Sequence, residues 1–501
     1  MPTQHSEDEI RPLLREDAIQ ARLTTERDQS EPDVEGARKL KTAPTPIPRT
    51  QLGILCLLRI VDPLSFNQIF PYINEFVSDL YVTDDPSQVG FYSGLVESAF
   101  ALTQLLSIYL WSYTSDHLGR RPVVLAGLAG LATTTLLFGL SKSFATVMLT
   151  RALGGIASGN VPVIPSMLIE ITDESNQAVA FAFFGMWWPI GTIAGPLIGG
   201  LLSKPAARFP KYLDYQFLRD NPYFLPCLMV ASFTLFSFVV ASFMLEETME
   251  SKKTGKKLNV QSNSSMIAQE NAVATRYTAK ELLGFPVIRA LCFSGFALSF
   301  LSTAFDVLFV LFCYSPVLLG GLAFSPSEIG FALSTSGFLA ALLQVFFMPM
   351  VLNRVDHAKL YHFSMKLWPY VFLSLPLLNV IARLGLDEET GRLTPRTVQV
   401  LWVSIALMLS VFRLAVIAYS VNMLLVKKYV PSPASLGSTI GLIQFSICAA
   451  RAIAPAVASS IFAFSASTGL LGGYLWVPVL TTFAFMGSLF SKNIVKETSR
   501  I

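Results

Sequence analysis

The chain has 501 residues, of which 52% are hydrophobic and only 14% are charged, and its mean hydropathy is +0.53. Soluble domains carry about 25% charged residues, so this composition excludes an ordinary soluble protein and indicates a polytopic membrane protein. The net charge of +3 is too small to indicate binding to nucleic acid.

The five cysteines lie in apolar stretches, and no two of them form a CxxC pair. They are typical of small buried hydrophobic side chains. The chain has four histidines and no HExxH motif, so we expect no metal site and no cofactor. No nucleophile–base arrangement is visible, which argues against an enzyme.

Residues 1–48 are polar and charged. They hold too few large apolar side chains to fold alone, so we expect a disordered cytosolic tail. Within it, Glu9, Leu13 and Leu14 fit the acidic dileucine pattern that sorting adaptors bind. Such a short pattern also arises by chance, so an inert tail stays open.

Twelve apolar segments follow, each near the ~20 residues needed to cross a bilayer. We predict spans at 52–77, 90–113, 122–141, 145–168, 178–202, 223–245, 286–314, 327–352, 363–384, 398–425, 435–464 and 470–491. They form an N-terminal half (49–245) and a C-terminal half (285–492), joined by a polar linker (246–284) and followed by a tail (493–501). The predicted class is an all-α membrane protein with two six-helix halves.

The orientation follows from basic residues in the loops, which favour the cytosolic side. Arg120 and Arg121 follow span 2, and Lys427 and Lys428 follow span 10. These residues and the basic central linker share one side if both termini are cytosolic. The segment 203–222, on the other side, carries four basic residues and breaks the rule.

The turn between spans 2 and 3 contains Asp116, Gly119, Arg120 and Arg121. A tight reversal favours Gly, and Asp116 can accept hydrogen bonds from the arginines. An ordinary basic loop is the alternative interpretation. The segment resembles the D-x-x-G-R-[RK] signature of the major facilitator superfamily, although Ser112 stands where that signature usually has Gly.

Span 4 carries Arg151, Gly155 and Gly159 at four-residue spacing. Small residues at this spacing let two helices approach closely. The segment resembles the family's R-x-x-x-G signature, which the resemblance ties to proton coupling. A structural Arg is the alternative, and we expect its side chain to lie near the outer side of the membrane.

Span 5 carries Gly191, Gly195, Pro196 and Gly199. Pro inside a helix removes one backbone hydrogen bond and kinks the helix. The spacing resembles the G-x-x-x-G-P-x-x-G-G signature of the antiporter branch, and a generic packing kink is the alternative. Local stretches, such as Leu245–Thr248, are similar to the fungal and plant zinc-induced-facilitator-like proteins. These resemblances imply the major facilitator fold and proton-coupled efflux, but not the substrate.

Ionisable residues within spans are functional candidates, because hydrocarbon penalises charge. We hypothesise that Asp62 or Glu97 carries a transported proton, with fixed ion pairs as the alternative. The charge of Arg59, three residues before Asp62, can neutralise it. The other intramembrane charges are Asp306, Arg413 and Arg451, and Asp306 can pair with either arginine.

Four polar residues on the predicted spans are candidates for a central cavity: Asn67, Gln68, Gln104 and Gln344. Since the sequence has no P-loop motif, an ion or solute gradient must supply the energy. We therefore expect a monomeric proton-coupled antiporter of a small organic solute, in the plasma or vacuolar membrane. The candidate solutes are drugs, secondary metabolites, organic acids and metal chelators. A proton-independent facilitator and a transporter-like sensor are the alternatives.

Overall fold

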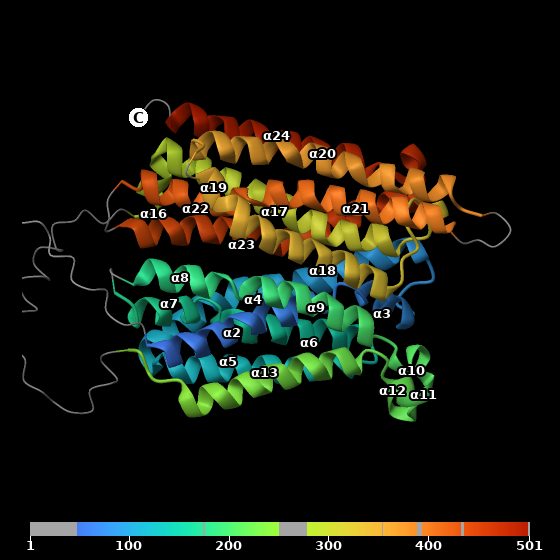
Figure 1. The fold of residues 1–501 in the computed structure, drawn as a ribbon, viewed down its shortest axis with the longest axis horizontal. Helices are drawn as coiled ribbons and strands as arrows, with labels where there is room; N and C mark the ends of the chain where they lie inside the picture. The colour runs from blue at the N-terminus through green and yellow to red at the C-terminus, as the bar shows by residue number, and fades with distance from the viewer. Residues whose placement is uncertain are drawn as a thin grey trace, which may run out of the picture. The chain divides into compact units, whose positions relative to one another are not determined.

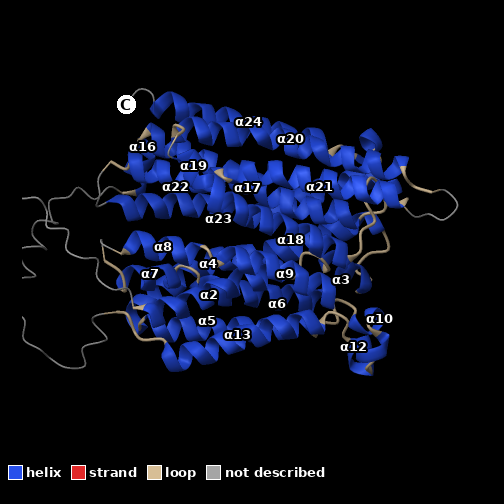
Figure 2. Cartoon of the chain, in the orientation of Figure 1, coloured by secondary structure: helices blue, strands red, loops and turns tan. Residues whose placement is uncertain are grey.

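The structure is a computed structural model that describes residues 48–173, 176–249, 278–352, 354–387, 393–431 and 435–498. Helices make up most of these residues (Figure 2). An isolated β-bridge between Leu386 and Leu393 is the single strand-like pairing among them. The predicted all-α class is therefore confirmed.

Several predictions from the sequence fall outside the described residues. These are the sorting residues Glu9, Leu13 and Leu14, nearly all of the N-terminal tail, and most of the central linker.

The N-terminal half begins with α2, which contains Pro63 and ends at Asn67, four residues before Pro71. A second interruption contains Gly159 and Pro162 and separates α6 from α7. The helices of this half are α2 (Arg49–Asn67), α3 (Ile73–Asp79), α4 (Val89–Leu118), α5 (Arg120–Gly139), α6 (Phe144–Ala157), α7 (Val163–Glu170), α8 (Gln177–Gly185), α9 (Trp188–Leu202), α10 (Pro205–Arg208), α11 (Pro210–Leu213), α12 (Gln216–Asp220) and α13 (Phe224–Met244), with 3₁₀ turns η1 (Pro86–Gln88) and η2 (Ser158–Asn160).

The C-terminal half has longer uninterrupted helices. A short π-helical stretch, η5 (Leu343–Phe347), follows α18 directly. The helices of this half are α16 (Ala279–Gly284), α17 (Pro286–Tyr314), α18 (Pro326–Leu342), α19 (Met348–Leu352), α20 (His357–Leu384), α21 (Pro395–Val416), α22 (Ala418–Tyr429), α23 (Leu436–Thr468) and α24 (Trp476–Thr498), with 3₁₀ turns η4 (Val317–Leu319) and η7 (Leu470–Gly473).

Nine helices within the described residues are long and apolar enough to cross a membrane. They coincide with nine of the predicted spans. The other three predicted spans fall on α2 with α3, on α6 with α7, and on α24. The arrangement is consistent with twelve spans, several of which are divided between two helices: α2 and α3, α6 and α7, α8 and α9, and α21 and α22.

Each half has its own hydrophobic core. The largest cluster of buried apolar side chains draws on α17, α20, α21 and α24, and Phe70 is its one buried member from the N-terminal half. The N-terminal half is held by separate clusters built from α2, α5, α7 and α13. Figure 1 shows the same division, with blue-to-green helices in one layer and yellow-to-red helices in the other. Two separate cores are what two halves need in order to move as units.

The halves contact each other near the end of the bundle where α9 ends and α18 begins, which we call the Gly200 end. A Cβ on Gly200 would lie 2.5 Å from the carbonyl oxygen of Pro326, so the two helices touch there backbone to backbone. On the other seam, between α4 and α23, a Cβ on Gly94 would lie 1.9 Å from Ser459 Oγ. The Ser98 hydroxyl also accepts a hydrogen bond of 2.9 Å from the Ala456 backbone amide.

Two of the four basic residues of segment 203–222, which broke the loop-charge rule, are paired with acidic side chains. Lys204 Nζ lies 2.8 Å from both Glu75 Oε1 and Asp79 Oδ2. Burial alone would lower the pKa of Lys204, but hydrogen bonds to Asp79 and Glu75 outweigh it and raise the pKa above its usual range. Arg219 is paired with Asp214 in the same way. Because the rule counts Lys and Arg and is not a rule of net charge, segment 203–222 remains an exception to it.

Candidate functional site

A cavity of about 600 Å³ lies between the two halves. Such a volume suits a drug-sized organic molecule. Its wall combines aromatic rings, amides and charges, and it is drawn from both halves: Arg59, Phe66, Asn67, Phe70, Gly185, Trp188, Thr192 and Pro196 on one side, and Ser302, Thr303, Asp306, Leu333, Gln344, Arg413, Tyr419, Ser420, Asn422, Met423, Gln444, Ile447 and Arg451 on the other.

Two of the four polar residues predicted for this cavity, Asn67 and Gln344, lie on its wall. The other two lie elsewhere. Gln68 is buried against Cys227, and Gln104 donates a hydrogen bond of 2.9 Å to Ser158 Oγ. Both point into the N-terminal half because the helix faces that carry them pack against α13 and α6.

Sequence reasoning missed several cavity residues, among them Asn422 and Gln444. A polar residue within an apolar span is the signal that was available for both. Asn422 is almost completely buried, and its Nδ2 donates to Tyr361 Oη at 3.4 Å while its Oδ1 has no partner within the described residues. Its position is therefore held by the C-terminal half.

A buried ion pair lies in the N-terminal half. Arg151 Nη2 on α6 is 3.2 Å from Glu97 Oε2 on α4, and both side chains are at least 93% buried. The Arg151 guanidinium is turned toward the carboxylate inside this half, and its predicted place near the outer side of the membrane stays a prediction. The second carboxylate oxygen, Glu97 Oε1, is buried without a hydrogen-bond partner in the described part of the chain.

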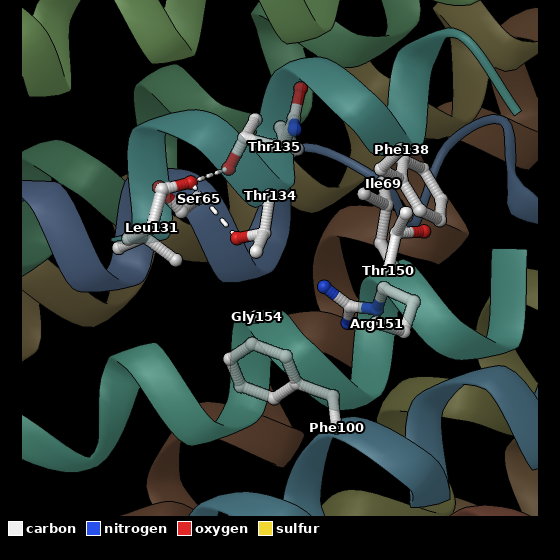
Figure 3. A pocket seen from close by; sticks show the side chains of 11 residues that line it. Ser65, Ile69, Phe100, Leu131, Thr134, Thr135, Phe138, Thr150, Arg151 and Gly154 are labelled. Atoms are coloured by element: carbon white, nitrogen blue, oxygen red, sulfur yellow. Dashed lines mark hydrogen bonds between the residues drawn. The ribbon is translucent and has the colours of Figure 1, made fainter. Parts of the chain in front are cut away.

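Aromatic rings surround the Arg151 guanidinium. It lies 4.4 Å from the ring centroid of Phe100 and 5.8 Å from that of Phe138. Figure 3 shows it projecting into a small pocket with Phe100 nearby and with Thr134 and Thr135 on the opposite wall. Both threonine hydroxyls donate to the Leu131 carbonyl, so they are already satisfied. The pocket holds about 20 Å³, which is room for about one water molecule.

Glycines on α6 bring the ion pair together. A Cβ on Gly155 would lie 2.3 Å from the Phe100 carbonyl oxygen, and one on Gly159 would lie 2.3 Å from the Trp111 ring. Only helices without side chains at these positions can approach so closely. The R-x-x-x-G spacing thus places Arg151 one turn from the crossing of α4 and α6, within reach of Glu97.

Asp62 lies in a separate hydrogen-bonded chain. Its Oδ1 accepts a hydrogen bond of 2.5 Å from Ser158 Oγ, which in turn accepts from Gln104. Arg59 is close enough for its charge to act on Asp62, as predicted, but the two form no direct ion pair among the described residues. The Arg59 guanidinium instead stacks 4.4 Å from the Trp188 ring centroid. The two proton candidates, Asp62 and Glu97, therefore have different partners.

The remaining intramembrane charges meet at the cavity. Asp306 lies close enough to Arg413 and Arg451 to interact with both charges, but it forms no direct ion pair with either among the described residues. Arg413 Nε donates to the Ser336 hydroxyl and carbonyl at 2.8 and 3.0 Å, and Arg451 lies 5.6 Å from the Phe66 ring centroid.

The glycines of α9 form a stripe against α2. A Cβ on Gly191 would lie 2.6 Å from the Pro63 ring, and one on Gly195 would lie 3.0 Å from the Leu64 carbonyl oxygen. At Gly199 the nearest atom, the Gln68 carbonyl oxygen, would be only 1.8 Å away. The next residue, Gly200, faces α18 instead. The stripe with Pro196 therefore packs α9 within its own half, while its end meets the other half.

The turn between α4 and α5 carries a network of charges. Arg120 pairs with Asp116 at 2.6 Å and with Glu170 at 3.0 Å. Gly119 has a φ of +107°, which a residue with a Cβ rarely adopts. Arg121 Nη2 donates to the Ser242 carbonyl at 2.5 Å. The arginines thus hold the turn to α7 and α13.

Glu247, which follows α13, is a residue whose role sequence reasoning missed. Its two carboxylate oxygens accept hydrogen bonds from the backbone amides of Arg120 and Arg121, at 2.9 and 3.1 Å. These amides are at the start of α5, where a negative charge also stabilises the helix dipole. The available signal was its place in Leu245–Thr248, where the chain resembles the zinc-induced-facilitator-like proteins.

Replacing Glu247 with Ala is expected to lower the midpoint of thermal unfolding of the purified protein. The change leaves two amides at the start of α5 without their partner, at a cost of about 1–3 kcal/mol. The matched control is Glu246→Ala, since the adjacent Glu246 side chain is exposed. An equal midpoint for the two variants would contradict the capping role.

The sequence is similar to a known family profile and to several known transporters. The Major Facilitator Superfamily profile matches residues 55–455. The major facilitator-type transporter psiT2 of Psilocybe cyanescens is 39% identical over 492 residues, covering 92% of this chain and 93% of that protein. The efflux pump azaK of Aspergillus niger is 29% identical over 431 residues, covering 86% and 85%.

Two further similarities concern the predicted subfamily and the fold. Protein ZINC INDUCED FACILITATOR-LIKE 1 of Arabidopsis thaliana is 29% identical over 303 residues, covering 60% of this chain and 63% of that protein. A solved structure of a bacterial homologue of the human lysosomal transporter Spinster aligns with a TM-score of 0.63 at 14% identity, covering 91% of this chain and 99% of that one.

Proposed function

Because the chain belongs to the major facilitator superfamily, as an integral multi-pass membrane transporter and not an enzyme, we propose that it is a proton-coupled antiporter that exports a small organic solute. The observation that carries the proposal is the combination of an organic-sized cavity with buried carboxylates outside its wall. The cavity receives the solute, and Glu97 or Asp62 receives the proton.

The separation of these two sites supports exchange. Glu97 and Asp62 lie in the N-terminal half and are absent from the wall of the central cavity. Both are held by groups that favour the ionised carboxylate: Arg151 for Glu97, and Ser158 for Asp62. Protonation would release those partners. Since Ser158 and Arg151 lie on the α6–η2 segment that packs against α4, a proton can bias the packing of this half.

Two further observations support the proposal, the first bearing on movement of the halves and the second on export. The glycine–proline stripe of α9 packs against α2 and meets α18 at the Gly200 end, as expected for a seam that moves between states. A curated relative similar over 86% of the chain is called an efflux pump. Neither observation identifies the solute.

The test uses the full chain in proteoliposomes with a pH-sensitive dye trapped inside. Anionic, neutral and cationic organic solutes are added on one side, and the change in internal pH is recorded. An antiporter is expected to move protons against the solute, and to accumulate solute when a pH gradient is imposed. Solute flux that leaves internal pH unchanged and ignores an imposed gradient would instead identify a proton-independent facilitator.

The orientation is also part of the proposal. We place both termini and the Arg120–Arg121 turn on the cytosolic face, in the plasma or vacuolar membrane. In intact cells, single cysteines at Asp116 and at Lys256 are expected to react with an impermeant maleimide only after the plasma membrane is opened, whereas both should react on isolated intact vacuoles, whose outer face is cytosolic. Reaction of just one of the two in intact cells or vacuoles would contradict the arrangement.

A further inference from the structure

We propose that the solute is an organic anion, bound in the central cavity by Arg59, Arg413 and Arg451. This inference rests on the proposed transport function and names its substrate class. It starts from the charges on the cavity wall, which are three arginines and one carboxylate, Asp306.

The charge on this wall is not balanced by the protein. Asp306 is the single acidic residue among the wall residues, and Asp62, which is close enough to interact with Arg59 and Arg451, is bound by Ser158. Even with both carboxylates ionised, three positive charges face two negative ones. A charged residue in a membrane interior is costly and normally has a partner or a water-filled cavity. An anionic solute supplies the missing negative charge.

Two of the three arginines, Arg59 and Arg413, are held in place and keep donors available. Stacking on the rings of Trp188 and Phe184 orients Arg59, whose Nε is buried without a hydrogen-bond partner in the described residues. Arg413 is fixed through its Nε by Ser336. A planar guanidinium presents paired N–H donors that match a carboxylate or phosphate group. Positioned guanidinium groups of this kind are suited to recognition of such anions.

The rest of the wall describes the body of the solute. Phe66, Phe70, Trp188 and Tyr419 provide aromatic faces, and amides such as Asn422 and Gln444 provide hydrogen bonds. The combination fits an aromatic or otherwise planar molecule with at least one acidic group. Asp306 has the opposite effect: its negative charge reduces the affinity for any anion and keeps the empty cavity from becoming too positive.

The test compares two dyes with the same xanthene ring and opposite charge, carboxyfluorescein and rhodamine 6G, binding to the purified full chain in detergent. Fluorescence polarisation measures the Kd. The anion is expected to bind at least about tenfold more tightly than the cation, and Arg413→Gln and Arg451→Gln are each expected to weaken it by about tenfold. Asp306→Asn is expected to strengthen binding of the anion.

The control is Arg219→Gln, since Arg219 is exposed and paired with Asp214 outside the cavity. It is expected to leave both Kd values unchanged. If the arginine variants do not fold, the affinities of the two dyes for the unaltered chain and for Asp306→Asn still test whether the cavity prefers an anion. Tighter binding of the cation, weaker anion binding in Asp306→Asn, or no anion binding below about 1 mM would overturn the inference.

This assay contains no gradient, so its outcome is separate from the proposed function. Anion binding without proton exchange in vesicles leaves the substrate class standing and removes the antiport mechanism. Proton exchange driven by a cationic solute, with no preference for the anionic dye, supports the antiport mechanism and removes the proposed substrate class.

Discussion

Glu97→Gln protein in proteoliposomes is expected to lose solute accumulation driven by a pH gradient, while solute still moves down its own gradient. Glutamine keeps an oxygen that can accept a hydrogen bond from Arg151. Its amide does not ionise, however, so it cannot take up and release a transported proton. Since Glu97 lies outside the central cavity, the cavity itself is unchanged. The measurement is the ratio of accumulated to equilibrated solute, with and without the imposed gradient.

A loss of folding must be distinguished from a loss of coupling. Neutralising one member of a buried ion pair leaves the other charge without its partner, which costs about 3–5 kcal/mol. Glu97→Gln is therefore expected to lower the thermal midpoint as well. In the double variant Glu97→Gln/Arg151→Gln the buried charge is gone, so stability is expected to return in part while coupling stays absent.

Glu246→Gln is the matched control, because this carboxylate is exposed beyond the end of α13. It is expected to accumulate solute normally. Asp62→Asn is tested as well, because Asp62 is the second candidate for carrying the transported proton. If Glu97→Gln and Asp62→Asn proteins are both folded and both keep full gradient-driven exchange, the proton role of these residues is refuted.

The helical fold could be predicted well from the sequence because the sequence signals for membrane-spanning helices are local. Runs of apolar residues near the length of a bilayer, and glycine with proline at fixed spacing, are visible without any contact information. The same local signals explain why α2–α3 and α6–α7 were predicted as continuous spans. Pro71 and Pro162 were visible, but whether a proline kinks a helix or ends it depends on the helices that pack around it.

The partners of the charged residues were not predictable in the same way. The spacing of three residues predicted that Arg59 can neutralise Asp62, but it gave no sign of the hydrogen bond that Asp62 accepts from Ser158, almost a hundred positions later in the chain. Glu247 caps α5 across an even longer separation. Such pairings depend on how helices cross, and that depends on glycines whose role is visible only once the neighbouring backbone is known.

The adjacent glycines Gly199 and Gly200 at the end of α9 are expected to respond differently to the same substitution. Gly199→Ala is expected to disrupt the N-terminal half itself, because the new Cβ would lie 1.8 Å from the Gln68 carbonyl oxygen. A backbone atom of α2 cannot move aside as a flexible side chain can. We expect little monodisperse protein and a lower thermal midpoint, with an overpacking cost of about 3 kcal/mol. Gly53→Ala in α2, where nothing lies within 4 Å, is the matched control and should be neutral or slightly stabilising.

Gly200→Ala should act differently, because the three atoms nearest to its Cβ, on Pro326, Ser327 and Gly330, all belong to the other half. The strain disappears when the halves separate at the Gly200 end, so the variant should fold but favour the state that is open there. An overlap worth about 1–3 kcal/mol shifts that equilibrium by a factor of roughly 5 to 150. Spin labels on Asp84→Cys and Leu318→Cys, both exposed and in opposite halves, report the distance by double electron–electron resonance. A longer distance in Gly200→Ala than in Gly53→Ala is the expected result. If the two distance distributions are identical, the contact at Gly200 does not control the separation of the halves.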